Sequence, residues 1–174
     1  MLGVYSMIER NIANLKQETG GRDPAQLLMI IPGEGGVGKS RTIQAITTNF
    51  IRRNVAHLLV KSAFTGIAAS LIEGKTLHVV AQMSVNGDKR SQKATRMLTK
   101  FWREKRYLID EMSMVACHLL AHMSAALSKG KNLAGMEHAQ LPFGGVNVVL
   151  VGDFHQFPPV CGKPLYWKLD RSRA

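Results

Sequence analysis

The sequence predicts an α/β protein with an open, mainly parallel sheet and helices on both faces. Short apolar runs that suit strands alternate along the chain with segments whose apolar residues recur at helical spacing. One run, VNVVLV at 146–151, is apolar at all but one position, as is typical of strands covered on both faces. The chain has 174 residues, 45% of them hydrophobic, which suits one compact domain with its own core.

The first half of the chain reads as helix, strand, helix, strand and short helix. Apolar residues at helical spacing predict the first helix: Tyr5, Ile8, Ile12 and Leu15. GGRD at 20–23 ends it, and LLMII at 27–31 is predicted to be a buried strand. After GEGGVGKS at 33–40, a second helix is marked by Ile43, Ile46, Phe50 and Ile51. HLLV at 57–60 then predicts a strand, and GIAASLI at 66–72 a short helix.

The second half continues the alternation. RYLID at 106–110 predicts a strand, KGKNLAGMEHAQLPFGG at 129–145 a loop, and VNVVLV the next strand. Between the strand at 106–110 and this loop, a helix is marked by Val115, Leu119, Met123 and Ala126. Residues 89–106 carry eight basic residues and one acid, and their apolar residues share one helical face: Ala94, Met97, Leu98, Phe101 and Trp102. This segment is either a solvated amphipathic helix or a basic surface for a polyanion.

The most specific motif is GEGGVGKS, which fits the phosphate-binding pattern GxxxxGKS and lies between a predicted strand and a predicted helix. Glycines let successive backbone N–H groups face phosphate oxygens, and the helix N-terminus adds its positive dipole end. Lys39 is expected to reach the β and γ phosphates and Ser40 to ligate Mg²⁺. The predicted nucleotide-binding residues are Gly33, Glu34, Gly35, Gly36, Val37, Gly38, Lys39, Ser40 and Arg41.

The strand predicted at 106–110 ends at one acid, Asp110, and a second acid, Glu111, follows it. They therefore lie at the carboxyl edge of the sheet, where open α/β sheets bind ligands. Asp110 is predicted to hold Mg²⁺, and Glu111 to polarise the water that attacks ATP. For Glu111 an alternative is that it begins the following helix and complements the helix dipole.

The charge of the chain favours a polyanionic partner, and nucleic acid is the first candidate. The 23 Lys and Arg residues outnumber 12 Asp and Glu residues and leave a net charge of +11. With two cysteines, Cys117 and Cys161, a disulfide framework is excluded. We see neither a membrane-spanning run nor a signal peptide, so we expect an intracellular protein, nuclear if its source is a eukaryote, that does not act at a membrane.

Six segments in order resemble the first RecA-like domain of superfamily-1 DNA helicases of the Pif (petite integration frequency) type: GEGGVGKS, TGIAAS, GKTLH, LIDEMSM, PFGG and GDFHQFPPV. The resemblance implies a phosphate-loop NTPase with a RecA-like fold that uses ATP and Mg²⁺. It also implies 5′ to 3′ movement along single-stranded DNA and unwinding at duplex junctions. Repair, recombination, telomere maintenance and transposition all stay open as genomic roles, as does the oligomeric state.

The resemblance also assigns roles to individual residues. In this family the segment resembling GDFHQFPPV links the nucleotide to the DNA track, with Gln156 as the γ-phosphate sensor beside Lys39 and Glu111. Asp153 would orient the turn, although two prolines also suit a plain exit from a strand. The implied DNA-binding residues are Thr65, Gly66, Thr76, His78, Lys93, Arg96, Lys100, Pro158 and Pro159. His78 is equally well interpreted as a capping or core group.

Three departures from the family pattern limit the function. The adenine-contacting glutamine has no counterpart, because Gln17 comes too late, and Phe64 and Phe157 replace the usual proline and leucine. Phe64 either alters the DNA-facing loop or fills a gap beneath it. We also expect residues 1–174 to hold only the first RecA-like domain, with a small basic insert at about 86–105. The second domain and its arginines would belong to a longer protein.

We therefore expect an ATPase motor domain of a DNA helicase, poorly active without the second domain. The alternative is a nucleotide-dependent DNA-binding module with little or no turnover. A small-molecule kinase is a third class, since the basic insert resembles a kinase lid. That class leaves GDFHQFPPV without a purpose.

Overall fold

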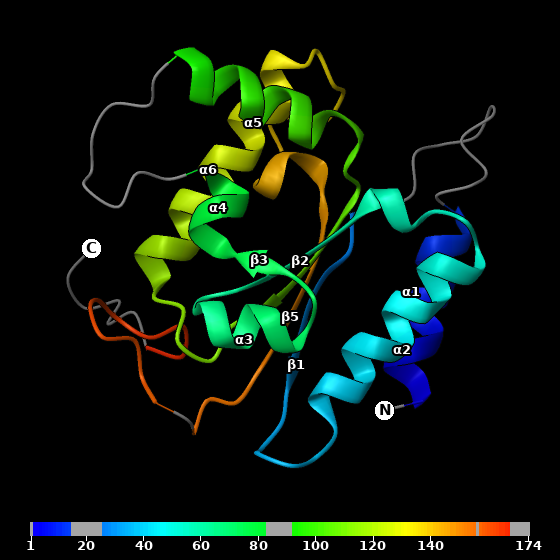
Figure 1. The fold of residues 1–174 in the computed structure, drawn as a ribbon, viewed down its shortest axis with the longest axis vertical. Coiled ribbons are helices and arrows are strands. Elements are labelled where there is room, and N and C mark those ends of the chain that lie inside the picture. Colours follow the sequence, from blue (N-terminus) through cyan, green and yellow to red (C-terminus); the bar gives the residue numbers. More distant parts are fainter. Residues whose placement is uncertain (1, 15–25, 83–91, 156, 168–174) are drawn as a thin grey trace, which may run out of the picture.

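The computed structural model describes residues 2–14, 26–82, 92–155 and 157–167. Their centre is a parallel sheet of five strands in the order β1-β5-β4-β2-β3, which confirms the predicted fold class. The strands are β1 Leu28–Pro32, β2 Leu59–Ala63, β3 Lys75–Thr76, β4 Tyr107–Glu111 and β5 Asn147–Gly152. Because β1, β5 and β4 are parallel neighbours, the segments that follow them leave the same edge of the sheet (Figure 1).

Helices cover both faces of the sheet (Figure 1). The helices are α1 Leu2–Asn14, α2 Lys39–Arg52, α3 Gly66–Leu71, α4 Leu77–Ala81, α5 Gln92–Glu104 and α6 Cys117–Leu133, with 3-10 turns at Ala56–Leu58 and Pro142–Gly145. Neighbouring residues of one strand point to opposite faces. Ile109 of β4 therefore packs in a cluster with α1, α2 and α3, while Leu108 packs in a second cluster with α4, α5 and α6.

The prediction that residues 27–31 form a buried strand is wrong in one respect. A strand forms there, as β1, but Leu28 and Ile30 are 50% and 54% exposed. The cluster that contains α4, α5 and α6 includes residues of β2, β4 and β5 and none of β1, so these helices do not cover β1. Met29 and Ile31 pack against the cluster formed with α1 and α2, so only one face of β1 is covered by described residues.

Two other predicted boundaries are also corrected. In HLLV at 57–60, the first two residues belong to a 3-10 turn. The strand begins only at Leu59 and continues to Ala63. The loop predicted from residue 129 begins later, because α6 continues through Gly130 to Leu133. A Cβ atom at Gly130 would lie 3.3 Å from Leu98 Cγ, so this glycine lets α5 and α6 pack closely. Tertiary packing there overrides the low helix propensity of glycine.

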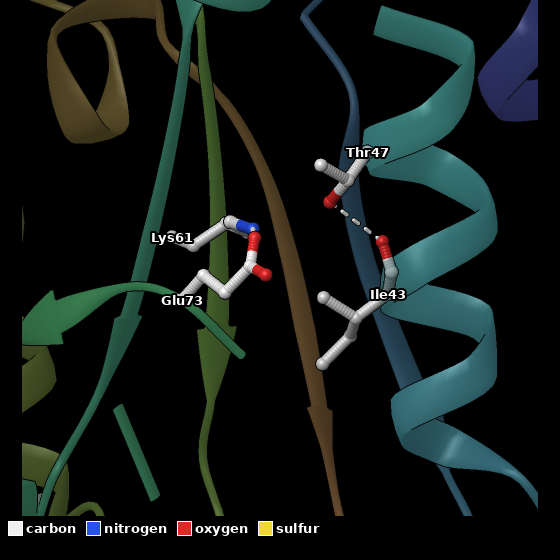
Figure 2. A network of polar contacts seen from close by, with 4 residues as sticks. All are labelled: Ile43, Thr47, Lys61 and Glu73. Atoms are coloured by element: carbon white, nitrogen blue, oxygen red, sulfur yellow. Dashed lines mark hydrogen bonds and ion pairs between the residues drawn. The ribbon is translucent and has the colours of Figure 1, made fainter. Parts of the chain in front are cut away.

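The segment GKTLH is fixed against β2 by a close approach and an ion pair. A Cβ atom at Gly74 would lie 2.6 Å from the Lys61 carbonyl oxygen, so only glycine fits beside this strand. Lys61 Nζ lies 3.6 Å from Glu73 Oε2, and Figure 2 shows the two side chains facing each other.

Figure 2 also shows a hydrogen bond within α2, in which the Thr47 hydroxyl donates to the Ile43 carbonyl at 2.8 Å.

The basic segment forms α5, and its apolar face is part of the main core. Leu98 and Trp102 are fully buried, and Trp102 Nε1 donates to the Val80 carbonyl of α4 at 3.1 Å. The helix is therefore built into the domain. The connection after the helix is bound to the 3-10 turn before β2, because Arg106 N–H donates to the Leu58 carbonyl at 3.0 Å.

We expect Trp102→Ala to lower the free energy of unfolding by about 3–5 kcal/mol, because it removes a large buried side chain and leaves a cavity. Urea unfolding followed by circular dichroism measures this loss. The matched control is Met97→Ala on the same helix, where the side chain is 55% exposed and we expect a change within about 0.5 kcal/mol. Equal losses in the two variants would contradict the core position of Trp102.

Candidate nucleotide-binding site

The phosphate-binding pattern forms the loop between β1 and α2. Gly36 and Gly38 have φ angles of 81° and 91°, a conformation that strains any residue with a side chain. Lys39 opens α2, and its Nζ donates to the carbonyl oxygens of Gly33 and Glu34, both at 2.7 Å. The ammonium group thus lies over the loop itself. Ser40 and Arg41 are exposed in the first turn of the helix.

Asp110 lies two strands away in the sheet and is completely buried. The Ser62 hydroxyl of β2 donates to Asp110 Oδ1 at 2.5 Å, and Oδ2 is buried without a hydrogen-bond partner. Burial raises the pKa of this carboxyl to about 7, with a smaller increase from the charge of Glu111, against the Ser62 hydrogen bond that lowers it. The carboxyl is therefore held where its charge lacks compensation.

A divalent cation fits this arrangement. Mg²⁺ prefers oxygen ligands, and a cation would satisfy the buried oxygen Oδ2 of Asp110. Ser40 adds a hydroxyl oxygen in the first turn of α2, at the same carboxyl edge of the sheet. These two residues are the predicted Mg²⁺ ligands.

Glu111 is the last residue of β4 and is half-buried. Its Oε1 accepts hydrogen bonds from the Ser113 hydroxyl at 2.5 Å and from the Ser113 N–H at 3.3 Å. The alternative of a helix-capping acid is wrong, because α6 begins only at Cys117 and Ala116 is its N-cap residue. Glu111 instead faces the turn that follows β4.

The turn after β5 carries the segment GDFHQFPPV. Asp153 orders this turn as predicted: it is buried, and its Oδ1 accepts a hydrogen bond from the His155 N–H at 2.8 Å. Gln156 lies outside the described residues, so its role as sensor stays a prediction. Pro158 is exposed and Pro159 half-buried, beside Phe157, which is 80% exposed.

The residues matched to DNA contacts lie on two short helices. Thr65 Oγ1 accepts from the Ala68 N–H at 3.1 Å and caps α3, which leaves its hydroxyl hydrogen able to donate. Gly66 is exposed at the start of the same helix. Thr76 and His78 are half-buried around the start of α4. The centroid of the His78 ring lies 5.9 Å from that of Phe64, which is partly buried and packs against the core.

The basic residues of α5 form a separate surface. Lys93, Arg96 and Lys100 are exposed and share one helical face with Arg103. Figure 1 shows α5 toward the end of the sheet opposite the phosphate loop. The fold therefore brings the phosphate loop, Asp110 and Glu111 together at one edge and does not bring the α5 face to them.

Two hydroxyl groups of the site were not singled out by the sequence analysis. Ser62 contacts Asp110 across the β2–β4 pair, and no pattern in a single sequence reveals that register. Ser113 lies inside the motif LIDEMSM, two residues after Glu111. The short distance in sequence between Ser113 and Glu111 was a signal of this hydrogen bond, because Ser side chains often bond to groups two residues away.

A parallel sheet with a glycine loop between β1 and α2, and with an uncompensated carboxylate at the end of β4, defines a phosphate-loop nucleotide-binding domain. The family described as PIF1-like helicase matches residues 10–169, and the chain belongs to this family.

Relatives of known sequence and structure agree with this assignment. The ATP-dependent DNA helicase PIF1 of Candida albicans is 37% identical over 138 residues, which are 75% of this chain and 14% of that protein. The crystal structure of Pif1 helicase from Candida albicans superposes with a TM-score of 0.64 and 31% identity, over 88% of this chain and 33% of that one. The Bacteroides Pif1 structure in complex with ADP-AlF3 and ssDNA has a TM-score of 0.59 and 26% identity, over 89% of this chain and 33% of that one.

The chain thus spans about a seventh of the Candida albicans helicase sequence and a third of the solved structures. In the described ranges, no helix has the length and hydropathy to cross a membrane.

Proposed function

We propose that the chain is the ATP-binding and hydrolysing motor domain of a DNA helicase that moves 5′ to 3′ along single-stranded DNA. The observation that carries the proposal is the carboxyl edge of the sheet, where Lys39 lies after β1 and where Asp110 and Glu111 end β4. Membership of the PIF1-like helicase family supports it, as does similarity to a Pif1 whose structure holds both a nucleotide and ssDNA. A second RecA-like domain would complete the motor.

The proposed reaction is divided among named groups. The Lys39 ammonium would exchange its bonds to the loop carbonyls for bonds to the β and γ phosphates. Mg²⁺ held by Ser40 and Asp110 would neutralise phosphate charge. Glu111 would accept a hydrogen bond from the attacking water and orient it, while Gln156 would sense the γ phosphate.

DNA would be bound on surfaces apart from the nucleotide. Hydroxyl and small residues at 65–66 and 76–78 suit contacts to phosphate and sugar, which do not read sequence. The exposed Phe157 adds a ring on which a base could stack, next to Pro158 and Pro159. The basic face of α5 would neutralise phosphates of DNA near a junction.

Steady-state ATP hydrolysis with and without single-stranded DNA, beside a strand-separation assay, tests this function. DNA-stimulated hydrolysis supports the motor. Nucleotide-dependent DNA binding without hydrolysis, even when the chain is extended by a second RecA-like domain, would establish the alternative of a DNA-binding module. A chain that binds no nucleotide would refute both.

We expect Asp110→Asn to weaken ATP binding at least tenfold when Mg²⁺ is present, because the variant loses the buried carboxylate oxygen that would face the cation. Binding in EDTA is the internal control, and there the variant should match the wild type. Affinity for Mg²⁺-ATP equal to the wild type would remove Asp110 from the cation site.

The same variant tests the pKa of Asp110. Since the folded pKa of about 7 lies above the ordinary value of 3.8, the wild-type protein loses stability as pH rises from about 4 to 7. The amide of the variant cannot ionise, so the variant should gain stability relative to the wild type over that window. Thermal unfolding at pH 5 and pH 8 measures the difference.

We expect the triple reversal of Lys93, Arg96 and Lys100 to Glu to weaken single-stranded DNA binding more than tenfold at low salt. It should also reduce the slope of log affinity against log salt by about 2, since each lost phosphate contact removes roughly 0.7. Fluorescence anisotropy at several salt concentrations measures both quantities. Reversal of Arg10 and Arg52, exposed on α1 and α2, is the control. If the control loses as much DNA affinity per reversed charge as the α5 variant, binding depends on the net charge of the protein and not on the basic face of α5.

A further inference from the structure

One peptide unit, between Gly152 and Asp153, connects the phosphate loop with the turn that holds Glu111. Its carbonyl oxygen accepts a hydrogen bond of 2.9 Å from the N–H of Gly33, which is the first residue of the phosphate loop. Its N–H, on Asp153, donates to the Ser113 hydroxyl oxygen at 2.9 Å. Because a peptide unit is planar and stiff, a tilt that follows one of these bonds changes the other.

Ser113 continues the connection to the carboxylate. A hydroxyl group has one hydrogen to donate and two lone pairs that accept. The Ser113 hydrogen is donated to Glu111 Oε1 at 2.5 Å, and a lone pair receives the Asp153 N–H. Three hydrogen bonds in series therefore run from Gly33 through the 152–153 peptide and Ser113 to Glu111.

The packing around this series leaves little room for adjustment. A Cβ atom at Gly152 would lie 3.0 Å from both Ser113 N and Ser113 Oγ, and 2.8 Å from Met112 Cγ. Glycine at 152 is thus needed for the close approach of β5 to the turn after β4. The Asp153 carboxylate extends the ordering to His155, next to the segment that continues to Gln156.

We propose that Ser113 is a positioning residue that holds the Glu111 carboxylate and makes its orientation depend on the phosphate loop. This inference rests on the proposed ATPase function. A displacement of Gly33 when phosphate binds moves the Gly152 carbonyl, tilts the peptide and shifts the Ser113 hydroxyl. The Glu111 carboxylate is then aligned for the attacking water only when the phosphate loop is filled.

The first test separates alignment of Glu111 from binding. We expect Ser113→Ala to lower the single-turnover rate constant of ATP hydrolysis at least tenfold while the dissociation constant of Mg²⁺-ATP stays within about twofold. Ser113→Thr keeps the hydroxyl and should recover the rate to within about threefold. The matched control is Ser124→Ala, which removes a hydroxyl of α6 that accepts the Phe143 N–H at 2.9 Å and does not contact Glu111. We expect this control to keep the wild-type rate.

The second test needs no turnover. Amide exchange at Gly33 and Asp153 is followed by NMR while Mg²⁺ and a non-hydrolysable ATP analogue are added. In the wild type both amides should change their protection together. In Ser113→Ala the Asp153 amide should exchange faster at the outset and respond to the analogue much less, while Gly33 still responds.

The outcomes distinguish this inference from the function on which it rests. A wild-type chain that does not bind the analogue overturns both. If the wild type binds and hydrolyses ATP, a wild-type rate in Ser113→Ala overturns the role of Ser113 alone, as does an equal loss in Ser113→Ala and Ser124→Ala. If it binds without measurable hydrolysis, the exchange experiment decides, and an Asp153 amide that responds equally in the wild type and Ser113→Ala overturns the inference.

Discussion

Lys39→Ala is expected to reduce the affinity for ATP about a thousandfold, to below detection at micromolar nucleotide. Lys39 is the cation that the loop holds over its own carbonyl groups, through two bonds of 2.7 Å. Removal of one partner from a hydrogen-bonded charge pair costs roughly 2–5 kcal/mol, and each 1.4 kcal/mol is a factor of ten. Isothermal titration with Mg²⁺ and a non-hydrolysable ATP analogue measures the loss.

The control for this prediction is Lys129→Ala, which removes an exposed lysine of α6. We expect Lys129→Ala to bind the analogue as tightly as the wild type. Thermal unfolding of Lys39→Ala shows whether the variant is folded, since the substitution also removes two bonds inside the loop. A folded Lys39→Ala protein with wild-type affinity would refute the phosphate-loop assignment, and with it the proposed function.

Glu111→Gln is expected to slow ATP hydrolysis by about 10²–10⁴-fold, the contribution typical of a positioned base, while nucleotide binding changes little. Glutamine has the shape of glutamate, and its carbonyl oxygen can still accept the Ser113 hydroxyl hydrogen. It lacks the negative charge that polarises the attacking water. Single-turnover hydrolysis with protein in excess over labelled ATP measures the rate without depending on fast product release.

Glu137→Gln, an exposed acid after α6, is the matched control and should keep the wild-type rate. The dissociation constant of Mg²⁺-ATP is measured in parallel for each variant. A Glu111→Gln protein that hydrolyses ATP at the wild-type rate would mean that Glu111 only orders the turn at Ser113. The proposed catalytic role would then pass to another group at this edge.

The parts of this protein that the sequence predicts are those carried by contiguous residues. The phosphate loop is one such part, because the glycines, Lys39 and the flanking strand and helix all lie within a short stretch whose backbone geometry is local. The amphipathic α5 is another in part: Leu98 and Trp102 are buried as its 3.6-residue period predicts, but Met97 of the same predicted face is 55% exposed. The acids Asp110 and Glu111 are placed by the strand that they end.

The tertiary structure alone decides what depends on the order of the strands. β1 is half exposed because the helices α4, α5 and α6 pack over β2, β4 and β5 and not over β1, and an apolar run cannot show which helices cover a strand. Ser62 contacts Asp110 across a separation of 48 residues, and the Asp153 N–H reaches Ser113 across 40. Such hydrogen bonds act over about 3 Å and form only after the strands have paired in one register. The local sequence therefore specifies the chemical groups of the site, and the parallel pairing of β1, β5, β4 and β2 specifies which of them meet.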